Sequence, residues 1–325
     1  MRHPSGRVAA ALTALSCCLA LVVTGCANPE SEKTAPPAKA ADGTQMNLSP
    51  SQDRLHAQRI AAIADSVPEA VREDGFLDIV NLAGTEPPLS FYATDNQTVI
   101  GVEPDLATLV ADVLGLKPRF HTVSWENIFI GLDSGKYELA MTNVTVTEER
   151  KDKYDFATYR ADEVAFEAPR DADWTVRGPN DVAGRTIAVT AGTNQEQLLR
   201  TWDRQNRAKN LDPVTVKNFQ NPADYYLALG SGRVDAYLGP GPAGAYHAAA
   251  SGKTKVIGTF SSSGDGLEGR IGATVRKENG LIEPVAKALN VVMADGTYTE
   301  VLKRWGLQAE ALPKSEVNPP GIPRS

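Results

Sequence analysis

Strand-like and helix-like patterns alternate along most of this chain, and this alternation is what most constrains its fold. Short apolar runs suited to strands begin at Phe76, and segments with apolar side chains at helical spacing follow them. Residues 104–114 and 125–133 show helical spacing, and a second cycle opens with a strand at 186–190 and a helix at 194–205. Such alternation predicts an α/β protein, and two cycles of similar length predict two lobes.

The remaining elements are expected from the same patterns. Further strands are predicted at residues 76–80, 119–123, 139–144, 214–219, 234–238 and 271–275, and further helices at 222–229, 281–294 and 298–305. Ser49-Pro50 looks like an N-cap followed by proline at the first helical position, which predicts a helix through about Asp65. Gly115 is expected to end the helix before it as a C-cap.

The first 25 residues have the organisation of a secretory signal. Arg2 and Arg7 precede an apolar run, which ends in the small residues before Cys26. The run Val23-Thr24-Gly25-Cys26 resembles a bacterial lipobox, in which the cysteine is acylated and becomes the new N terminus. An ordinary signal peptide and an uncleaved membrane helix are the alternatives, although the apolar run is shorter than the ~20 residues that span a bilayer. We expect a lipoprotein signal at 1–25 and a chain held by its lipid on the outer face of the cell membrane.

Composition narrows the possible functions. Cys17, Cys18 and Cys26 are the three cysteines of the chain, and all lie within or directly after the signal. The mature fold is therefore expected to have no disulfide, no thiolate metal site and no catalytic cysteine. The formal charge of −7, with no stripe of Lys and Arg, argues against a nucleic-acid partner. We expect no cofactor and no metal.

The two ends of the mature chain have compositions unlike the rest. Residues 27–48 are rich in Pro, Ala and charge and cannot bury enough apolar surface to offset the entropy of ordering. Residues 26–70 are therefore expected to be a lipidated flexible tether that ends in the N-terminal helix. Residues 313–325 are polar and proline-rich, and we expect them to be a disordered tail in solvent.

A set of short motifs occurs between about residues 70 and 310. They are Pro87-Pro88-Leu89-Ser90-Phe91, Gly101-Val102-Glu103-Pro104-Asp105-Leu106, Trp125-Glu126, Ser134-Gly135-Lys136, Asn143 through Arg150, Asp155-Phe156, Arg276-Lys277, Gly296-Thr297-Tyr298 and Lys303-Arg304-Trp305-Gly306. Each motif is weak alone. Their order and spacing together resemble the solute-binding proteins of polar-amino-acid ABC importers.

The resemblance implies a fold. It is an α/β, periplasmic-binding-protein-like clamshell of two lobes, each a mixed sheet flanked by helices, with two hinge crossovers near 159–166 and 266–272. Lobe 1 would then comprise residues 71–163 plus 268–312, and lobe 2 residues 164–267. Ligand would bind in the cleft, and the lobes would close over it in a hinge motion.

The resemblance also implies a carboxylate clamp in lobe 1. Arg150 would hold the ligand's carboxylate, since a guanidinium can meet a carboxylate with two parallel hydrogen bonds. Asn143 and Thr145 would offer further donors to the same group. From the residues alone, Arg150 would instead be an exposed helix arginine, and Thr145 would cap a helix, a role that is compatible with ligand contact.

Four more residues complete the expected site. Thr193 and Asn194 begin a lobe 2 helix, where free N–H groups favour an anion, although an ordinary N-cap fits equally well. Trp125 would be an apolar wall of the cleft or a core residue. Pro240 replaces a carboxylate that the family usually offers to the ligand's ammonium group, and Glu86 replaces a cleft aromatic. Glu86 would then receive a cationic ligand group or remain a solvated loop residue.

The resemblance predicts a substrate-binding lipoprotein that captures a small solute, an amino acid or related zwitterion, and delivers it to an ABC permease. A tethered ligand sensor and a dehydratase-like enzyme on the same fold are the alternatives. Against an enzyme, His56, His121 and His247 are scattered, and neither a Ser-His-Asp order nor an HExxH motif is present. We therefore expect no catalytic residues.

Overall fold

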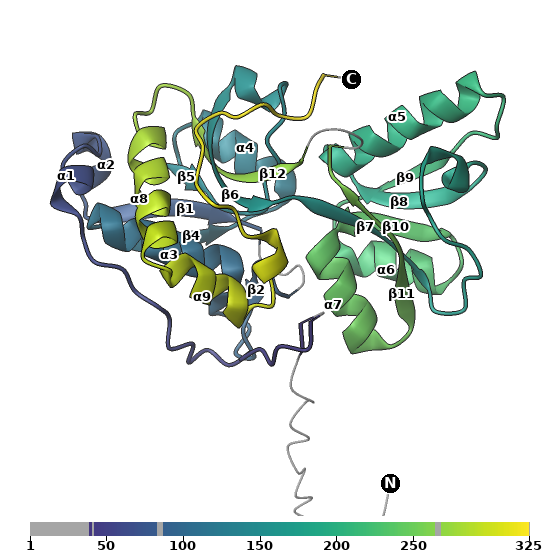
Figure 1. The fold of residues 1–325 in the computed structure, drawn as a ribbon, viewed down its shortest axis with the longest axis horizontal. Helices are drawn as coiled ribbons and strands as arrows, with labels where there is room; N and C mark the ends of the chain where they lie inside the picture. The colour runs from purple at the N-terminus through teal and green to yellow at the C-terminus, as the bar shows by residue number, and fades with distance from the viewer. Residues whose placement is uncertain (1–38, 41, 83–86, 264–267, 325) are drawn as a thin grey trace, which may run out of the picture. The chain divides into compact units, whose positions relative to one another are not determined.

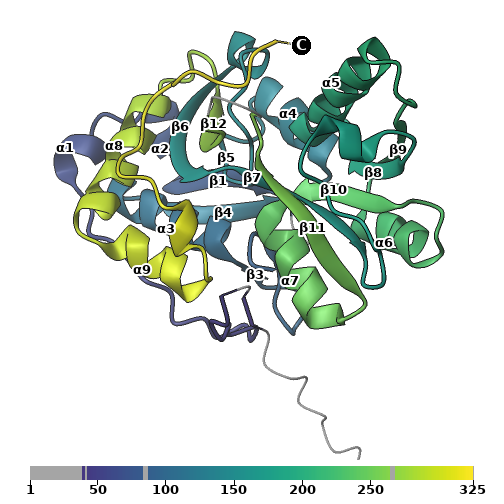
Figure 2. The ribbon, with the colours of Figure 1, turned by 45° about the vertical axis from the view of Figure 1, so that its right-hand side comes forward.

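Two five-stranded sheets, each flanked by helices, dominate the part of the chain that the structure describes (Figures 1 and 2). This computed structural model describes residues 39–40, 42–82, 87–263 and 268–324. The expected signal and Cys26 lie outside the described residues. Residues 36–325 group as one compact unit, within which each sheet and its helices form a lobe.

The first sheet belongs to lobe 1 and has the strand order β4-β1-β5-β12-β6. Its strands are β1 (Phe76–Asn81), β4 (Lys117–Thr122), β5 (Leu139–Ala140), β6 (Tyr154–Ala161) and β12 (Arg270–Arg276). Strands β4, β1 and β5 are parallel, whereas β12 is antiparallel to both β5 and β6. A short hairpin of β2 (Phe91–Tyr92) and β3 (Val99–Ile100) accompanies this sheet.

Helices pack on both faces of the first sheet. They are α1 (Ala61–Ala64), α2 (Glu69–Arg72), α3 (Val102–Leu114), α4 (Trp125–Asp133), α8 (Ile282–Ala294) and α9 (Thr297–Arg304), with 3₁₀ turns at Arg150–Asp152 and Gln308–Glu310. Successive β1 side chains point to opposite faces. Leu77 and Ile79 join the core with α3, α8 and α9, and Val80 joins a second core with α4. Gly115 caps α3 in the left-handed conformation, as expected.

The second sheet belongs to lobe 2 and has the order β11-β7-β10-β8-β9. Its elements are β7 (Glu163–Pro169), β8 (Thr186–Thr190), β9 (Thr215–Phe219), β10 (Ala236–Pro240), β11 (Thr254–Ser261), α5 (Asn194–Ala208), α6 (Pro222–Gly230) and α7 (Gly241–Ser251), with a 3₁₀ turn at Pro179–Val182. Ile187 and Leu238 face the core that α5 covers, whereas Ala188 and Tyr237 face α6. The α/β architecture with two mixed sheets matches the prediction.

The chain passes between the sheets twice. It leaves lobe 1 between β6 and β7, with Asp162 as the connecting residue, and returns between β11 and β12. The two crossings lie side by side, because the Asp162 N–H donates to Gly269 O at 3.0 Å and the Ser262 N–H donates to Asp162 O at 3.1 Å. This pairing places the crossover between the two lobes at Asp162.

The expected N-terminal helix is largely wrong. Only α1 is helical between Ser49 and Asp65, and Gln52 and its neighbours have no regular structure. Tertiary contacts take the backbone groups that a helix would use, since the Arg304 guanidinium donates to the carbonyls of Gln52 and Asp53. Asp53 itself has φ +45°, outside the right-handed helical region.

The expected disordered tail is also wrong for the residues that the structure describes. Residues 313–324 form an extended segment, here named the C-terminal strap, which follows β6 in Figure 1. Val317 forms an antiparallel bridge with Ala157, and the Asn318 N–H donates to Phe156 O at 2.9 Å. Strand β6 is an edge of its sheet, so its outer backbone groups need partners, and the strap supplies them.

One helix was not expected. The sequence patterns predict no element between residues 239 and 270, but α7 begins at Gly241, directly after β10. Pro242 lies in the first turn of α7, where the missing N–H costs no hydrogen bond. In the described part of the chain, no helix has the length and apolar character to cross a membrane.

Candidate functional site

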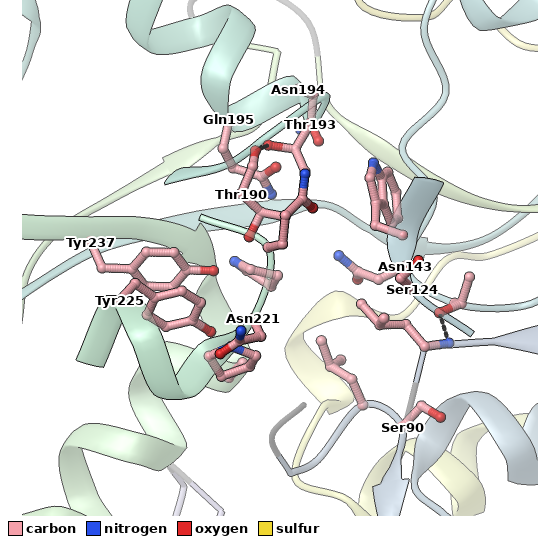
Figure 3. Close-up of a pocket in the computed structure, with 18 of the residues that line it drawn as sticks. Ser90, Ser124, Asn143, Thr190, Thr193, Asn194, Gln195, Asn221, Tyr225 and Tyr237 are labelled. Carbon is pink, nitrogen blue, oxygen red and sulfur yellow. Dashed lines mark hydrogen bonds between the residues drawn. The ribbon is translucent and has the colours of Figure 1, made fainter. Parts of the chain in front are cut away.

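A cavity of about 470 Å³ lies between the two lobes (Figure 3). We name it the inner cavity. Its polar lining from lobe 1 includes Ser90, Glu103, Ser124, Thr142 and Asn143, and that from lobe 2 includes Thr190, Thr193, Asn194, Gln195, Asn221, Tyr225 and Tyr237. The cavity lies beyond the carboxyl ends of parallel strands in both sheets, which is the usual place for ligands in α/β proteins.

Asn143 forms part of the lobe 1 wall, just after β5. Its backbone has φ +55°, a conformation that Asn tolerates better than most residues. Its N–H donates to a carboxylate oxygen of Glu103 at 3.2 Å, and its side-chain carbonyl accepts from the Arg160 guanidinium. The side-chain NH₂ is therefore the end of the amide that remains for the cavity (Figure 3).

A buried charge cluster supports this wall from behind. Glu103 is fully buried and accepts hydrogen bonds from the Tyr159 hydroxyl and from Arg160 at 3.1 Å. Arg160 also donates to Glu310. Burial alone would lower the pKa of Arg160, but the two carboxylates raise it overall. Arg160 thus stays charged and offsets the charge of Glu103 at the cavity wall.

Two tyrosines that sequence reasoning missed line the lobe 2 wall. Tyr225 of α6 and Tyr237 of β10 stack with ring centroids 3.8 Å apart and an interplanar angle of 8°. Figure 3 shows their hydroxyl ends directed toward the cavity, close to Asn221. Tyr237 lies near the end of an expected strand, which was the signal available in the sequence. Tyr225 approaches it only because α6 packs on that face of the sheet.

The start of α5 forms another part of the lobe 2 wall of the inner cavity. Thr193 is the N-cap, and its hydroxyl oxygen accepts from the Glu196 N–H at 3.4 Å. Glu196 in turn accepts from the N–H of Gly192, the residue before the N-cap, at 2.8 Å, so the side chain of the third helical residue closes the turn in the manner of a capping box. The ordinary capping interpretation of Thr193 therefore holds, and the N–H groups of Asn194 and Gln195 lie in the first turn, where they have no acceptor within the helix.

A second space, about 660 Å³, adjoins the inner cavity. We name it the arginine cleft, since its lining includes Arg150, Lys153, Arg200 and Arg204 together with Glu149 and Glu196. Thr193 and Asn194 line both spaces. Trp125 lies between them, because it lines the inner cavity while its indole N–H donates to Gly192 O across the lobes at 3.3 Å.

Arg150 is held in the arginine cleft by several contacts. Its guanidinium carbon lies 5.3 Å from the Trp125 ring centroid and 5.5 Å from that of Phe129, and it donates to Thr145 O at 2.9 Å. Burial lowers the pKa of Arg150 to about 10, although the nearby Asp162 and Glu149 act in the opposite direction. The side chain is therefore a cation at neutral pH, stacked on aromatic rings.

The structure brings most of the expected site residues to this region, but not into one space. Asn143, Trp125, Thr193 and Asn194 line the inner cavity, whereas Arg150 lines the arginine cleft.

Thr145 lines neither space. It is fully buried, and its hydroxyl donates to Asp162 at 2.6 Å. Pro240 lines the inner cavity, and Glu86 lies outside the described residues. No cluster of three or more His, Cys, Asp or Glu side chains able to hold a metal occurs in the described ranges.

Two lobes built on mixed sheets, with a cavity of polar and aromatic residues between them, form the architecture of a solute-binding protein. Comparison with known families identifies the family of solute-binding proteins to which this chain belongs. Residues 79–308 match the bacterial extracellular solute-binding proteins, family 3, and the chain belongs to that family. The C-terminal strap begins after the matched residues.

Individual relatives agree with this assignment. The chain is 29% identical over 238 residues to the L-cystine-binding protein TcyJ of Escherichia coli strain K12, across 72% of this chain and 84% of TcyJ. A solved ancestral arginine-binding protein bound to arginine is 30% identical with a TM-score of 0.62, covering 71% of this chain and 98% of its own. The ancestral amino acid-binding protein AncCDT-1, a precursor of cyclohexadienyl dehydratase, is 26% identical with a TM-score of 0.62, covering 73% and 98%.

Proposed function

We propose that this chain captures a small amino-acid-like solute between its lobes and delivers it to the permease of an ABC importer. The observation that carries the proposal is the inner cavity, which both lobes build from the carboxyl ends of their strands. Relatives named for binding cystine, arginine or amino acids support the same ligand class.

Within this proposal, the ligand's carboxylate lies at Thr193 and Asn194, which line both spaces. There it meets the N–H groups at the start of α5 and the Arg150 guanidinium. The rest of the ligand occupies the inner cavity, where Trp125 lines the lobe 1 side and Tyr237 presents its hydroxyl end from the lobe 2 side.

Two expected residues take specific places in the proposal. Thr145 acts through its carbonyl, which orients Arg150, while Asn143 offers its side-chain NH₂ to the ligand. Pro240 has neither charge nor donor at the place where the family offers a carboxylate. Glu86 is therefore proposed to receive the ligand's cationic group.

The proposal assigns no chemistry to the site and includes a membrane anchor. Relatives named as binding proteins support a role in binding alone. Export and lipidation at Cys26 rest on the N-terminal sequence, and they place the protein on the outer face of the cell membrane. Cys26→Ser should release the protein from the membrane fraction; a variant that stays in that fraction would argue against the lipid.

The proposal is tested by calorimetry with the twenty protein amino acids and L-cystine. The wild-type chain should bind at least one of them, and Arg150→Ala should weaken that binding. A hydrogen bond to a charged group contributes roughly 1.5–3 kcal/mol, which corresponds to about 10- to 150-fold in Kd.

Arg185→Ala is the matched control. Arg185 stacks on Trp174 at 4.4 Å, as Arg150 stacks on Trp125, but it lines neither the inner cavity nor the arginine cleft. Its removal should leave Kd unchanged. Binding of no compound in the panel by the wild-type chain would overturn the proposed function, and unchanged affinity in Arg150→Ala would remove Arg150 from the site.

A further inference from the structure

The C-terminal strap links two parts of lobe 1 that are distant in the sequence. Its first half lies along β6, where the Thr158 N–H donates to Glu316 O at 3.1 Å and Val317 bridges Ala157. Asn318 adds side-chain contacts, accepting from the Phe156 N–H and donating to Asp155, each at 2.9 Å. This half anchors the strap independently of the cleft.

The second half of the strap contacts the segment that carries Arg150. Ile322 pairs with it through two backbone hydrogen bonds, donating to Val146 O at 3.0 Å and accepting from the Glu148 N–H at 2.9 Å. The Gly321 N–H donates to the Glu148 carboxylate at 2.7 Å. Lys151, next to Arg150, donates to Pro319 O at 3.0 Å.

The opposite side of this segment is held by the returning strand β12. The Val146 N–H donates to Arg270 O at 2.9 Å, while Val146 O accepts from the strap. Residues 145–150, named here the Arg150 turn, are thus fixed between β12 and the C-terminal strap. Within the turn, Thr147 Oγ1 accepts from the Arg150 N–H at 3.0 Å, so the position of Thr147 determines the position of the Arg150 backbone.

We propose that the C-terminal strap is a positioning element for the ligand-binding arginine, and that residues 319–324 set the affinity for the ligand's carboxylate through Arg150. This inference rests on the proposed function, because it assigns the strap to the same site. It goes beyond that function, since the strap lies outside the residues that match the family.

Gly321 is a point at which a single methyl group can alter the contact between the strap and the Arg150 turn. A Cβ there would come within 2.9 Å of Thr147 Cα and of Val146 O, both of which are backbone atoms that cannot rotate away. Its backbone lies outside the left-handed region, so the cost of an added methyl group is steric alone. Gly321→Ala should therefore push the strap and the Arg150 turn apart.

Gly178→Ala is the matched control, because a Cβ at Gly178 would have no atom within 4 Å. Both variants are made in the full chain and titrated with L-arginine and with L-argininamide, which lacks the carboxylate. Gly321→Ala should weaken L-arginine binding at least tenfold and change L-argininamide binding less than twofold, whereas Gly178→Ala should change neither. Equal losses for both probes, or no loss for either, would overturn the proposal.

Hydrogen exchange gives a measurement that needs no ligand. In Gly321→Ala the Arg150 amide, which bonds within the turn, should exchange at least tenfold faster than in the wild-type chain, while the Phe156 amide keeps its protection. Unchanged exchange at Arg150 would overturn the positioning role even if the wild-type chain bound no amino acid. Failure of the proposed function and failure of this inference are therefore distinguishable.

A chain ending at Asn318 provides a second variant should Gly321→Ala fold poorly. It keeps the Val317 bridge and the Asn318 contacts on β6 but removes the hydrogen bonds that Gly321 and Ile322 make with the Arg150 turn. It should reproduce the loss of L-arginine binding and the faster Arg150 exchange. Wild-type behaviour in both assays would show that the strap only covers the edge of β6.

Discussion

The Arg150 turn of lobe 1 and the start of α5 in lobe 2 both line the arginine cleft, yet different contacts hold them. The α5 start is closed by hydrogen bonds among Gly192, Thr193 and Glu196, all within five residues. The Arg150 turn is held by Arg270 and Ile322, each more than a hundred residues away. One wall is therefore encoded locally, whereas the other exists only when distant parts of the chain have folded.

This difference predicts where remote changes will be felt. A substitution far from the cleft in sequence can displace Arg150 or Asn143, because both depend on partners in β6, β12 or the strap. The α5 start should be insensitive to such changes. Ligand affinity is then expected to respond to remote substitutions mainly through lobe 1.

The largest expected effect comes from Arg160, the buried cation behind the lobe 1 wall. Arg160→Met removes the charge that Glu103 and Glu310 share and leaves the buried Glu103 and the largely buried Glu310 without a cation. Breaking a buried pair in this way costs about 3–5 kcal/mol of unfolding free energy. Urea denaturation measures it, and hydrogen exchange should show the loss in lobe 1.

Arg200 is the lobe 2 counterpart for comparison. It pairs with Glu196 at 2.5 Å, but its side chain is 55% exposed, so Arg200→Met should cost less than about 1 kcal/mol. Similar costs for the two substitutions would contradict the distinction between a wall held over long range and one held locally.

A smaller effect is expected at the cap of α5. Thr193→Ala removes the N-cap hydroxyl and should lower the unfolding free energy by about 1 kcal/mol. The change should stay local, with faster exchange in the first turn of α5 and an unchanged Arg150 turn. Thr201→Ala, on the same helix but away from its end, is the control and should cost less.

The local wall is also the one that the sequence could predict. Thr193 followed three residues later by Glu196 is a capping pattern, and α5 begins where that pattern places it. The same holds for α4 and β8, whose bounds agree with their expected ranges, because their signals lie within the element itself. Elements whose bounds depend on neighbouring residues can therefore be predicted from the sequence.

The wall held over long range could not be predicted. Nothing near Pro319 or Ile322 shows that these residues contact the Arg150 turn, since their partners lie more than 160 residues earlier. The N-terminal segment was misjudged for the same reason, because Arg304 takes the carbonyl of Gln52. The resemblance placed Arg150 near the cleft, but only tertiary packing shows that Trp125 lies between it and the inner cavity.

The contact between the two lobes at Trp125 offers a finer test. Trp125→Phe keeps an aromatic ring against Arg150 but removes the indole N–H that donates to Gly192 O at 3.3 Å. A net hydrogen bond contributes about 0.5–1.5 kcal/mol, and this long one should lie at the lower end. Ligand affinity should fall only a few-fold, measured by calorimetry. A loss as large as that of Arg150→Ala would mean that Trp125 itself holds the ligand.

The smallest expected effect is on the pH dependence of stability, whose slope should have opposite signs on the two sides of the cleft. Burial raises the pKa of Asp162, which accepts from Thr145 behind the Arg150 turn. Burial also acts to raise the pKa of Glu196, but hydrogen bonds from Asn218, Gly192 and Arg200 lower it overall. An acid behind the Arg150 turn and an acid at the start of α5 thus have pKa shifts in opposite directions.

The pH dependence of stability should therefore have opposite slopes on the two sides. Folded Glu196 binds fewer protons than unfolded Glu, so its contribution is present above the unfolded pKa of about 4.3 and is lost as pH falls. Folded Asp162 binds more protons than unfolded Asp, so its contribution is lost as pH rises from about 3.9 through its raised pKa. With increasing pH, the wild-type chain should gain stability relative to Glu196→Gln and lose it relative to Asp162→Asn. Urea denaturation of the three chains between about pH 3.5 and 7.5 measures both slopes. Slopes of the same sign would show that the two walls of the cleft do not differ in their electrostatics.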